Sequence, residues 1–285
     1  MSHPALVPGR VAVVTGAAGG IGLAACRRFA QLGMRVCMAD VDEGQLTHAR
    51  TQVEKIAAGG ANDVLAVPTD VARFEDVERL KEAVDRTFGD VAVLMNNAAI
   101  GKGAGAWQDY PQWRKLLEVN LFGVIHGLQL FVPDMIRHGR PGAVVVTGSK
   151  QGITMPPGNA AYNVSKAGVK VVTEQLAHEL RQIEGGQMTA HLLIPGFTFT
   201  GITSPGKTDD TPKPPGAWTP DQVIDVLIDG LGTGRFYLFC QDNETTREMD
   251  ERRMQWAAED LIKDRPALSR WHPDYKDAFA AFMQG

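Results

Sequence analysis

Tyr162 and Lys166 lie four residues apart in a segment with helical periodicity, residues 160–183. On a helix this spacing places both side chains on one face. A free tyrosine titrates near pH ~10 and is a poor base at neutral pH. An ammonium group about 4 Å away in a shielded site favours the phenolate by up to ~4 kcal/mol, about three pKa units. The pair could therefore give a proton to a ketone or take one from an alcohol, although the spacing alone is common by chance.

A second group of residues could bind a dinucleotide. A glycine-rich turn, residues 15–22, follows the first valine-rich run and precedes a helical segment. Glycines in such a turn let the backbone approach a pyrophosphate at the positive end of the helix. Asp40 ends the next apolar run, where a carboxylate can accept both hydroxyls of an adenosine ribose and repels a 2′-phosphate. A helix cap is the alternative role for Asp40. Neither residues 15–22 nor residues 40–44 contain Arg or Lys, so the predicted cofactor is NAD and not NADP.

Short apolar runs that could position these groups alternate with longer helical segments. The runs are rich in valine and show little polar alternation, which is typical of strands buried on both faces. The alternation predicts an α/β fold of the Rossmann type, a doubly wound parallel sheet of about seven strands with helices on both faces. The predicted strands are Val11–Val14, Val36–Ala39, Val64–Val67, Val91–Met95, Ala143–Val146, His191–Ile194 and Phe236–Phe239, and the main helical segments are Phe74–Phe88, Tyr110–Ile136 and Ala160–Ile183 with a C-cap at Gly185-Gly186.

The motifs and their order resemble the classical short-chain dehydrogenases/reductases over about residues 11–201. The turn TGAAGGIG matches the TGxxxGxG fingerprint of that family. Residues 69–71 (TDV) resemble its adenine-contacting Asp-Val, and residues 96–99 (NNAA) resemble its NNAG segment with Ala99 in place of glycine. Residues 195–200 (PGFTFT) resemble its PG-x-x-x-T segment, which holds the nicotinamide carboxamide. The resemblance implies the strand order 3-2-1-4-5-6-7 and a cofactor site made by Gly16, Ala18, Gly20, Ile21, Gly22, Asp40, Asp70, Val71, Asn97, Tyr162, Lys166, Pro195, Gly196, Thr198 and Thr200.

The resemblance also assigns two further catalytic residues. Ser149 follows the fifth predicted strand and lies thirteen residues before Tyr162; a serine at this place hydrogen-bonds the substrate oxygen in the family. Asn120 stands in a helical segment, where asparagine is unfavourable, and the family places it in a water relay linked to the lysine. Taken alone, it could equally be a satisfied core amide. The implied catalytic tetrad is Asn120, Ser149, Tyr162 and Lys166.

Charge and cysteine content exclude several classes of protein. The formal net charge of −4 gives no general attraction to nucleic acid or anionic membranes. Three widely spaced cysteines argue against a disulfide framework and indicate a reducing compartment. The N-terminus shows no secretory pattern, and the chain has no unbroken apolar run of about 18 residues. His126, His178 and His191 lack partners at metal-ligand spacing. We therefore expect a cytoplasmic protein with no metal, nucleic acid or membrane partner.

Beyond residue 200 the family pattern fades. Residues 1–285 are read as one dehydrogenase domain with two additions. Residues 200–218, rich in Pro, Gly, Thr and Asp, predict a loop that closes over the substrate, followed by an N-cap at Thr219. Residues 245–285 predict a helical extension whose aromatic side chains need cover from the domain or from a neighbouring subunit. Its first helix carries an apolar stripe made by Met254, Ala257, Ala258, Leu261 and Ile262, and its tail carries Trp271, Tyr275, Phe279 and Phe282.

The predicted function is interconversion of a secondary alcohol and a ketone by hydride transfer with NAD(H), in a homodimer or homotetramer. The residues that we expect to border the substrate, residues 100–107 with Met155, Phe197 and Trp218, favour an apolar or bulky compound. The alternative is a non-catalytic NAD-binding regulator or scaffold on the same fold, which should tolerate loss of Tyr162 or Lys166. An extended-type epimerase would carry TGxxGxxG, and a hydrolase built on Ser149 would carry G-x-S-x-G; the sequence has neither motif.

Overall fold

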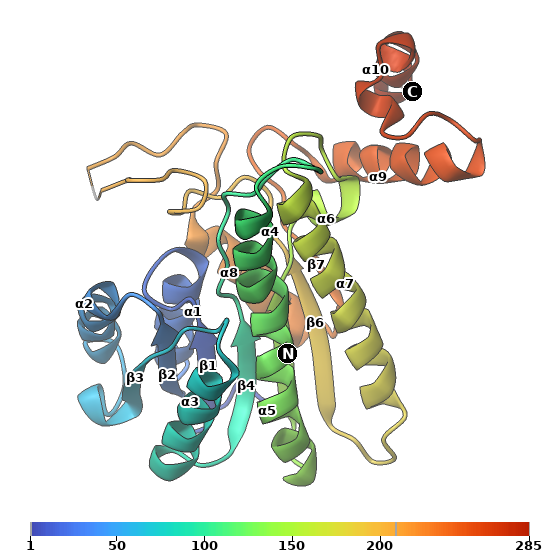
Figure 1. Ribbon diagram of the computed structural model, residues 1–285. Helices are drawn as coiled ribbons and strands as arrows, with labels where there is room; N and C mark the ends of the chain where they lie inside the picture. Colours follow the sequence, from blue (N-terminus) through green and yellow to red (C-terminus); the bar gives the residue numbers. More distant parts are fainter. Residues whose placement is uncertain (1, 209, 285) are drawn as a thin grey trace.

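The structure is a computed structural model that describes residues 2–208 and 210–284. Seven parallel strands form one sheet in the order β3-β2-β1-β4-β5-β6-β7, with helices on both faces (Figure 1). The predicted fold class and strand order are confirmed. The strands are β1 (Val11–Thr15), β2 (Arg35–Asp40), β3 (Val64–Pro68), β4 (Val91–Asn96), β5 (Gly142–Thr147), β6 (Met188–Ile194) and β7 (Tyr237–Phe239).

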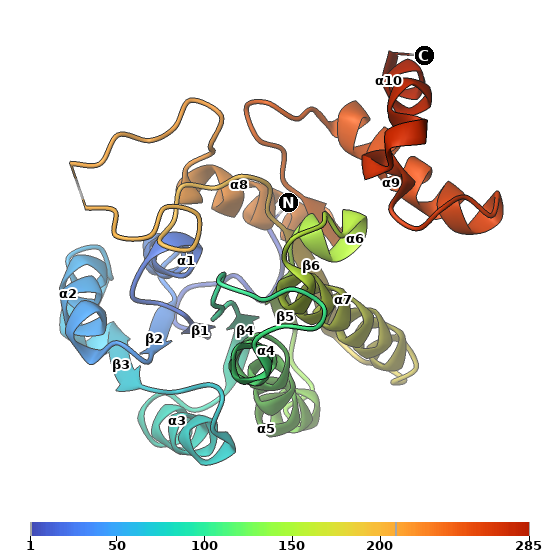
Figure 2. The ribbon, with the colours of Figure 1, turned by 45° about the horizontal axis from the view of Figure 1, so that its top comes forward.

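The valine-rich strands are buried because each face of the sheet supports its own hydrophobic core. Neighbouring residues of a strand point to opposite faces, so Val14 packs in one core and Val13 in the other. Phe29 belongs to the first core and Phe131 to the second. Figure 2 shows the two helical layers. The first contains α1 (Gly20–Gln31), α2 (Glu43–Glu54) and α8 (Pro220–Gly232), and the second contains α3 (Phe74–Thr87), α5 (Gly123–Arg137) and α7 (Ala160–Arg181).

The predicted helix over residues 110–136 contains an irregular turn. It consists of α4 (Tyr110–Leu117), a π-helical turn (Glu118–Phe122) and α5. The π turn contains Asn120, and such turns occur frequently at functional sites. Over residues 110–137 this helix is long and apolar enough to cross a membrane, but here it packs on the sheet, with 39% of its most apolar window buried.

The end of α7 differs from the sequence prediction. The helix ends at Arg181 and not at the glycine pair 185–186. The amides of Gln182 and Ile183 bond to carbonyls three residues earlier, which tightens the last turn and stops the α-helix. Gly185 lies beyond the helix with a φ of 68° and belongs to the connection to β6.

The loop of residues 200–218 begins and ends at the same place. Phe199 donates its amide to the Trp218 carbonyl, and Trp218 donates to the Phe197 carbonyl, at 2.9 and 2.8 Å. From this neck the loop reaches out over α2 in both views (Figures 1 and 2). Thr219 caps α8 with a reciprocal bond to Gln222, which confirms the predicted start of that helix.

The C-terminal extension stands away from the sheet (Figures 1 and 2). It contains α9 (Arg247–Ile262) and α10 (Lys276–Gln284). The predicted apolar stripe on α9 is wrong, because Leu261 and Ile262 are 90% and 77% exposed. The buried residue is Trp256, whose ring lies 5.3 Å from that of Phe279 and 5.2 Å from that of Phe282. The aromatic residues of the tail therefore pack against α9 itself. The face of α9 that they bury is the one with Trp256, and not the one with Leu261 and Ile262 that the apolar periodicity indicates.

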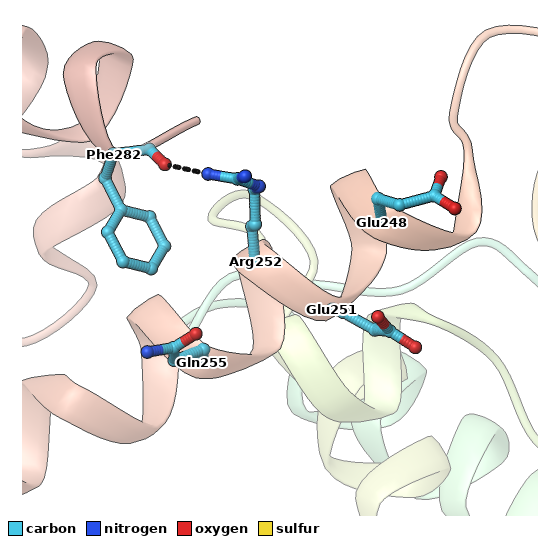
Figure 3. Close-up of a pocket in the computed structure, with 5 residues that line it drawn as sticks. All are labelled: Glu248, Glu251, Arg252, Gln255 and Phe282. Carbon is cyan, nitrogen blue, oxygen red and sulfur yellow. Dashed lines mark hydrogen bonds between the residues drawn. The ribbon is translucent and has the colours of Figure 1, made fainter. Parts of the chain in front are cut away.

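A cavity of about 510 Å³ lies between α9 and α10 (Figure 3). Arg252 spans it and donates a hydrogen bond of 2.7 Å to the Phe282 carbonyl. Charged and amide side chains line it, and the predicted site residues lie elsewhere. The lining residues are Glu248, Glu251, Arg252, Gln255 and Phe282.

Candidate active site

A cavity of about 1130 Å³ opens at the carboxyl ends of the strands. In open α/β sheets, ligands bind at this edge. The cavity joins the glycine turn after β1, the end of β2, the segments after β4, β5 and β6, and the start of α7. It brings together most of the predicted site residues: Gly16, Ala18, Gly20, Ile21, Asp40, Asn97, Ser149, Tyr162, Lys166, Pro195, Gly196, Thr198 and Thr200.

The glycine turn has no room for side chains at two positions. A Cβ atom on Gly16, where φ is 67°, would lie 2.8 Å from the Cα of Ala98. A Cβ on Gly22 would lie 2.1 Å from the Gly16 carbonyl oxygen, so glycine at this position allows close packing of the turn. Among the described residues that line the cavity, Gly22 is absent. Helix α1 begins at Gly20 without a side-chain cap. Its first amides are thus left for an anionic ligand.

Asn97 and Thr15 hold this turn in place. Asn97 Nδ2 donates to the carbonyls of Thr15 and Gly16, at 3.0 and 3.3 Å. In return, Thr15 Oγ1 accepts the amides of Asn97 and Ala98, at 3.0 and 3.1 Å. The turn after β1 and the segment after β4 therefore form one hydrogen-bonded unit. Thr15 was missed as a functional residue, since only its place at the start of the motif could have indicated it.

Asp40 points back toward the glycine turn. One carboxylate oxygen accepts the amide of Ala18 at 3.0 Å, and the other accepts the amide of Asp42 at 3.1 Å. The cap of α2 is Asp42, which accepts the amide of Gln45 at 2.9 Å. The alternative role of Asp40 as a helix cap is thereby excluded. A carboxylate is placed beside the turn at the mouth of the cavity.

Asp70 and Val71 lie outside the cavity wall formed by the described residues. Asp70 Oδ1 accepts the amide of Ala72 at 3.0 Å, which shapes the connection from β3 to α3. The Val71 carbonyl lies 2.9 Å from His126 Nδ1. The Val71 side chain fills the space beside Gly123. The predicted contact of these two residues with adenine stays a prediction.

Tyr162 and Lys166 lie in the first turns of α7, with Ser149 opposite them after β5. Burial raises the pKa of Tyr162, and a hydrogen bond with the Ser149 side chain lowers it in part. Lys166 Nζ donates to the Thr147 carbonyl at 2.9 Å and lies 5.8 Å from the centre of the tyrosine ring. Burial lowers the pKa of Lys166 to about 8. The cavity wall thus contains two hydroxyl groups, from Ser149 and Tyr162, and the buried amine of Lys166 near the tyrosine ring.

Asn120 binds the segment after β4 and does not reach Lys166. Its Oδ1 accepts the amide of Ile100 at 2.8 Å, and its Nδ2 donates to the carbonyl of Ile100 at 3.0 Å. The same Nδ2 also donates to Ser165 Oγ at 3.3 Å. Asn120 is 1% exposed and joins α7 to the loop above β4. Its role in a water relay stays a prediction.

The segment after β6 crosses in front of the glycine turn. A Cβ on Gly20 would lie 3.1 Å from the methyl carbon of Thr200. Thr203 Oγ1 accepts the amide of Thr200 at 3.1 Å and donates to the Thr198 carbonyl, which folds the segment into a tight turn. Thr198 Oγ1 donates to the Gly196 carbonyl at 3.2 Å.

The apolar wall differs from the one that the sequence predicts. Phe197 lines the cavity together with Ile202, a residue that sequence reasoning missed. Met155 and Trp218 are absent from the wall formed by the described residues. Trp218 packs against the hydrophobic core beneath the loop, and Trp107 is 89% exposed. Trp218 therefore attaches the end of the loop to the hydrophobic core and does not contact the cavity wall formed by the described residues.

The model of the short chain dehydrogenase family matches residues 10–211. The chain belongs to the short-chain dehydrogenase/reductase family. It is 34% identical over 270 residues to the 1-deoxy-11-beta-hydroxypentalenate dehydrogenase of Streptomyces exfoliatus, covering 92% of this chain and 94% of the relative.

Solved structures agree with this assignment. A short-chain dehydrogenase/reductase from Burkholderia phymatum in complex with NAD has a TM-score of 0.80 and 32% identity, and the match covers 90% of this chain and 96% of that one. An alcohol dehydrogenase from Thermococcus sibiricus complexed with 5-hydroxy-NADP has a TM-score of 0.68 and 27% identity, with coverages of 78% and 90%. This short-chain dehydrogenase/reductase is therefore an oxidoreductase that binds a nicotinamide cofactor and acts on CH–OH groups of small molecules.

Proposed function

We propose that this short-chain dehydrogenase/reductase interconverts a secondary alcohol and a ketone with NAD(H), and that Tyr162 is its acid/base. The observation that carries the proposal is that Ser149, Tyr162 and the buried Lys166 line one wall of the large cavity, with Lys166 Nζ 5.8 Å from the centre of the Tyr162 ring. The nicotinamide ring, when bound, supplies or accepts the hydride. The residues of the chain bind that ring, orient the substrate and move the proton.

The cavity wall fits a dinucleotide. The closely packed turn around Gly16 leaves its backbone facing the cavity, and the open amides of α1 suit a pyrophosphate. The Asp40 carboxylate suits the ribose hydroxyls of NAD and opposes the phosphate of NADP. Pro195, Gly196, Thr198 and Thr200 suit the nicotinamide end, because their segment lies between the glycine turn and Ser149.

The proton moves at the oxygen of Tyr162. In reduction the phenol gives its proton to the carbonyl oxygen, and in oxidation the phenolate takes it from the alcohol. Ser149 hydrogen-bonds the carbonyl or alcohol oxygen of the substrate. Burial favours the protonated phenol. Positive charge from Lys166 and from an oxidised nicotinamide ring favours the phenolate, so the two directions place opposite demands on one residue.

The cavity wall favours an apolar or bulky substrate. Phe197 and Ile202 supply apolar surface to the cavity, and Ile202 lies against Gly101, where a Cβ would be 2.5 Å from the Ile202 side chain. Most ligand sites combine such walls with a few polar groups that fix orientation. The hydroxyls of Ser149 and Tyr162 are the polar groups that would orient the reacting oxygen.

A homodimer or homotetramer is proposed as the assembly. The outer face of α7 leaves apolar side chains exposed, among them Val164 and Val171, at 48% and 53%. These two residues lie seven positions apart on α7 and share one face. A second copy of the chain would bury this face.

Steady-state turnover of a panel of secondary alcohols and ketones tests the proposal. We expect turnover with NAD(H), larger kcat/KM for bulky apolar compounds than for short-chain alcohols, and NADH binding measurable by its fluorescence. NADH binding without turnover of any panel member would favour the non-catalytic alternative. Equal kcat/KM values with NAD and NADP would overturn the cofactor assignment and leave the reaction type intact.

A further inference from the structure

A cluster of buried charges lies directly behind the catalytic serine. Lys150 follows Ser149, and its Nζ lies 2.6 Å from Asp250 Oδ2 and 3.3 Å from Asp242 Oδ2. The three side chains are 14%, 4% and 8% exposed in the order Lys150, Asp250 and Asp242. Arg253 adds a positive charge 3.8 Å from the other oxygen of Asp250. The two cations and two carboxylates balance in charge.

The cluster touches the cavity wall from behind. Lys150 is itself a lining residue. Its amide donates to the Pro195 carbonyl at 3.4 Å, and its Nζ would lie 2.9 Å from a Cβ on Gly196. Asp242 Oδ2 accepts the amide of Phe197 at 3.3 Å. Lys150 and Asp242 therefore contact the backbone of the segment after β6, and Lys150 ties that backbone to the neighbouring Ser149.

The cluster also connects distant parts of the chain. Lys150 comes from the segment after β5, Asp242 from the connection after β7, and Asp250 from α9 of the C-terminal extension. Asp250 and Trp256 are the buried residues of α9, and Asp250 faces the catalytic domain while Trp256 faces α10. The extension thus delivers one carboxylate to the rear of the active-site wall.

Stability alone is a poor reason for this arrangement. Burial raises the pKa of Asp250 above its ordinary range, even beside Lys150. For Asp242, burial acts in the same direction, but Lys150 and two backbone amides outweigh it and lower the pKa. Removing such charges from water costs several kcal/mol per ion, and well-packed apolar side chains often stabilise a fold equally well or better. What a charge cluster adds is a fixed geometry.

We propose that Lys150 is a positioning residue for the reaction, held between Asp242 and Asp250, so that α9 of the C-terminal extension forms part of the active site. The ammonium fixes the Pro195–Phe197 backbone relative to Ser149. A shift of this wall changes the angle at which the carbonyl or alcohol meets the serine and tyrosine hydroxyls. The inference rests on the function proposed above and assigns Lys150 no direct contact with the reacting atoms.

The test compares isosteric charge variants with a matched control on the same helix. Asp250→Asn and Asp242→Asn keep the side-chain size and remove one charge each. Glu251→Gln makes the same change at the next position, where the carboxylate is exposed and pairs with Arg247 at 2.6 Å. Lys150→Met removes the cation, and Lys150→Arg keeps it. For each variant kcat, KM, NADH affinity and thermal midpoint are measured on the full chain.

We expect Asp250→Asn to lower kcat/KM for the alcohol by about ten- to a hundredfold, mainly through kcat, because a misplacement of ~1 Å away from the chemistry can cost ~10²-fold. NADH affinity should change less than about twofold, and Lys150→Arg should retain more activity than Lys150→Met. Turnover by the wild type and by Glu251→Gln tests the proposed function independently of the role of Lys150. Folded Asp250→Asn and Lys150→Met variants with wild-type kcat would overturn the inference. So would failure of every charge variant to fold, since the cluster would then serve folding.

Discussion

The side chain of Asn120 pairs with both polar groups of the Ile100 backbone, accepting its amide at 2.8 Å and donating to its carbonyl at 3.0 Å. Asn120→Ala leaves both groups without a partner. We expect a loss of ~1–3 kcal/mol in the free energy of unfolding by urea, with a fall in kcat because Ala99 and Gly101, on either side of Ile100, line the cavity. Gln182→Ala, at the exposed end of α7, is the control. A variant as stable as the wild type would contradict this account.

Tyr162→Phe is expected to lower kcat by ~10²–10⁴-fold, the usual contribution of positioned acid–base catalysis. NADH affinity should stay close to the wild-type value, because the substitution removes one hydroxyl and keeps the ring. Lys166→Ala should reduce both kcat and NADH affinity. Single-turnover reduction by NADH separates the chemical step from binding. A Tyr162→Phe enzyme with more than about a tenth of the wild-type kcat would point to another acid.

Asp40 is expected to make kcat/KM with NAD at least about thirtyfold higher than with NADP. A 2′-phosphate carries a charge of about −1.5 to −2, and its repulsion by the carboxylate costs at least ~2 kcal/mol even with water-like screening. Asp40→Ser keeps an acceptor for the Ala18 amide and removes the charge, so it should reduce the preference. An unchanged ratio of the two kcat/KM values in this variant would place the selectivity elsewhere.

Because His3 is buried, we expect the folded protein to lose stability in acid. Burial, and then His191 nearby, lower the pKa of His3 from 6.5 to about 4. Above pH 6.5 the imidazole is neutral in both states and gives no pH dependence. As the pH falls from about 6.5 to about 4, the unfolded chain binds a proton that the folded chain does not, so the free energy of unfolding decreases.

Urea unfolding of the wild type and of His3→Gln across this pH range measures the effect. The glutamine variant can keep a hydrogen bond to Thr189, which His3 Nε2 contacts at 3.1 Å, and should show a shallower slope. Equal slopes would assign the acid sensitivity to other groups.

The assembly is expected to have at least twice the 30.8 kDa mass of the chain. Val171→Lys places a charge on the exposed apolar face of α7 and should dissociate the assembly or weaken it strongly, because a charge buried without a partner is costly. Light scattering at micromolar concentration measures the mass. A wild-type chain that scatters only as a monomer would contradict the prediction.

The sheet, and the position of Tyr162 and Lys166 on one cavity wall, could be predicted from the sequence because each has a local signature. Runs such as Val91–Met95 are apolar at every position and rich in valine, which is typical of a strand covered on both faces. The pair Tyr162 and Lys166 lies within one helical turn, so its geometry follows from spacing alone.

The charge cluster and the extension could not be predicted in this way. Lys150, Asp242 and Asp250 lie up to 100 residues apart, and nothing near any of them indicates the other two. On α9 the apolar period suggested Leu261 as a buried residue, but the partner of that helix is α10, which meets it around Trp256. Which face of a helix is buried depends on what approaches it, and that is a property of the fold.

The neck formed by Phe197, Phe199 and Trp218 has an evolutionary consequence. Two backbone hydrogen bonds close the loop before it leaves the domain, so the sheet does not depend on the residues in between. Doubling the length of a flexible loop costs only ~0.6 kcal/mol in closure entropy. Nature or an engineer can therefore exchange the residues beyond Thr203 as a cassette, and acquire new substrates while Thr200 and the proposed acid/base Tyr162 stay untouched.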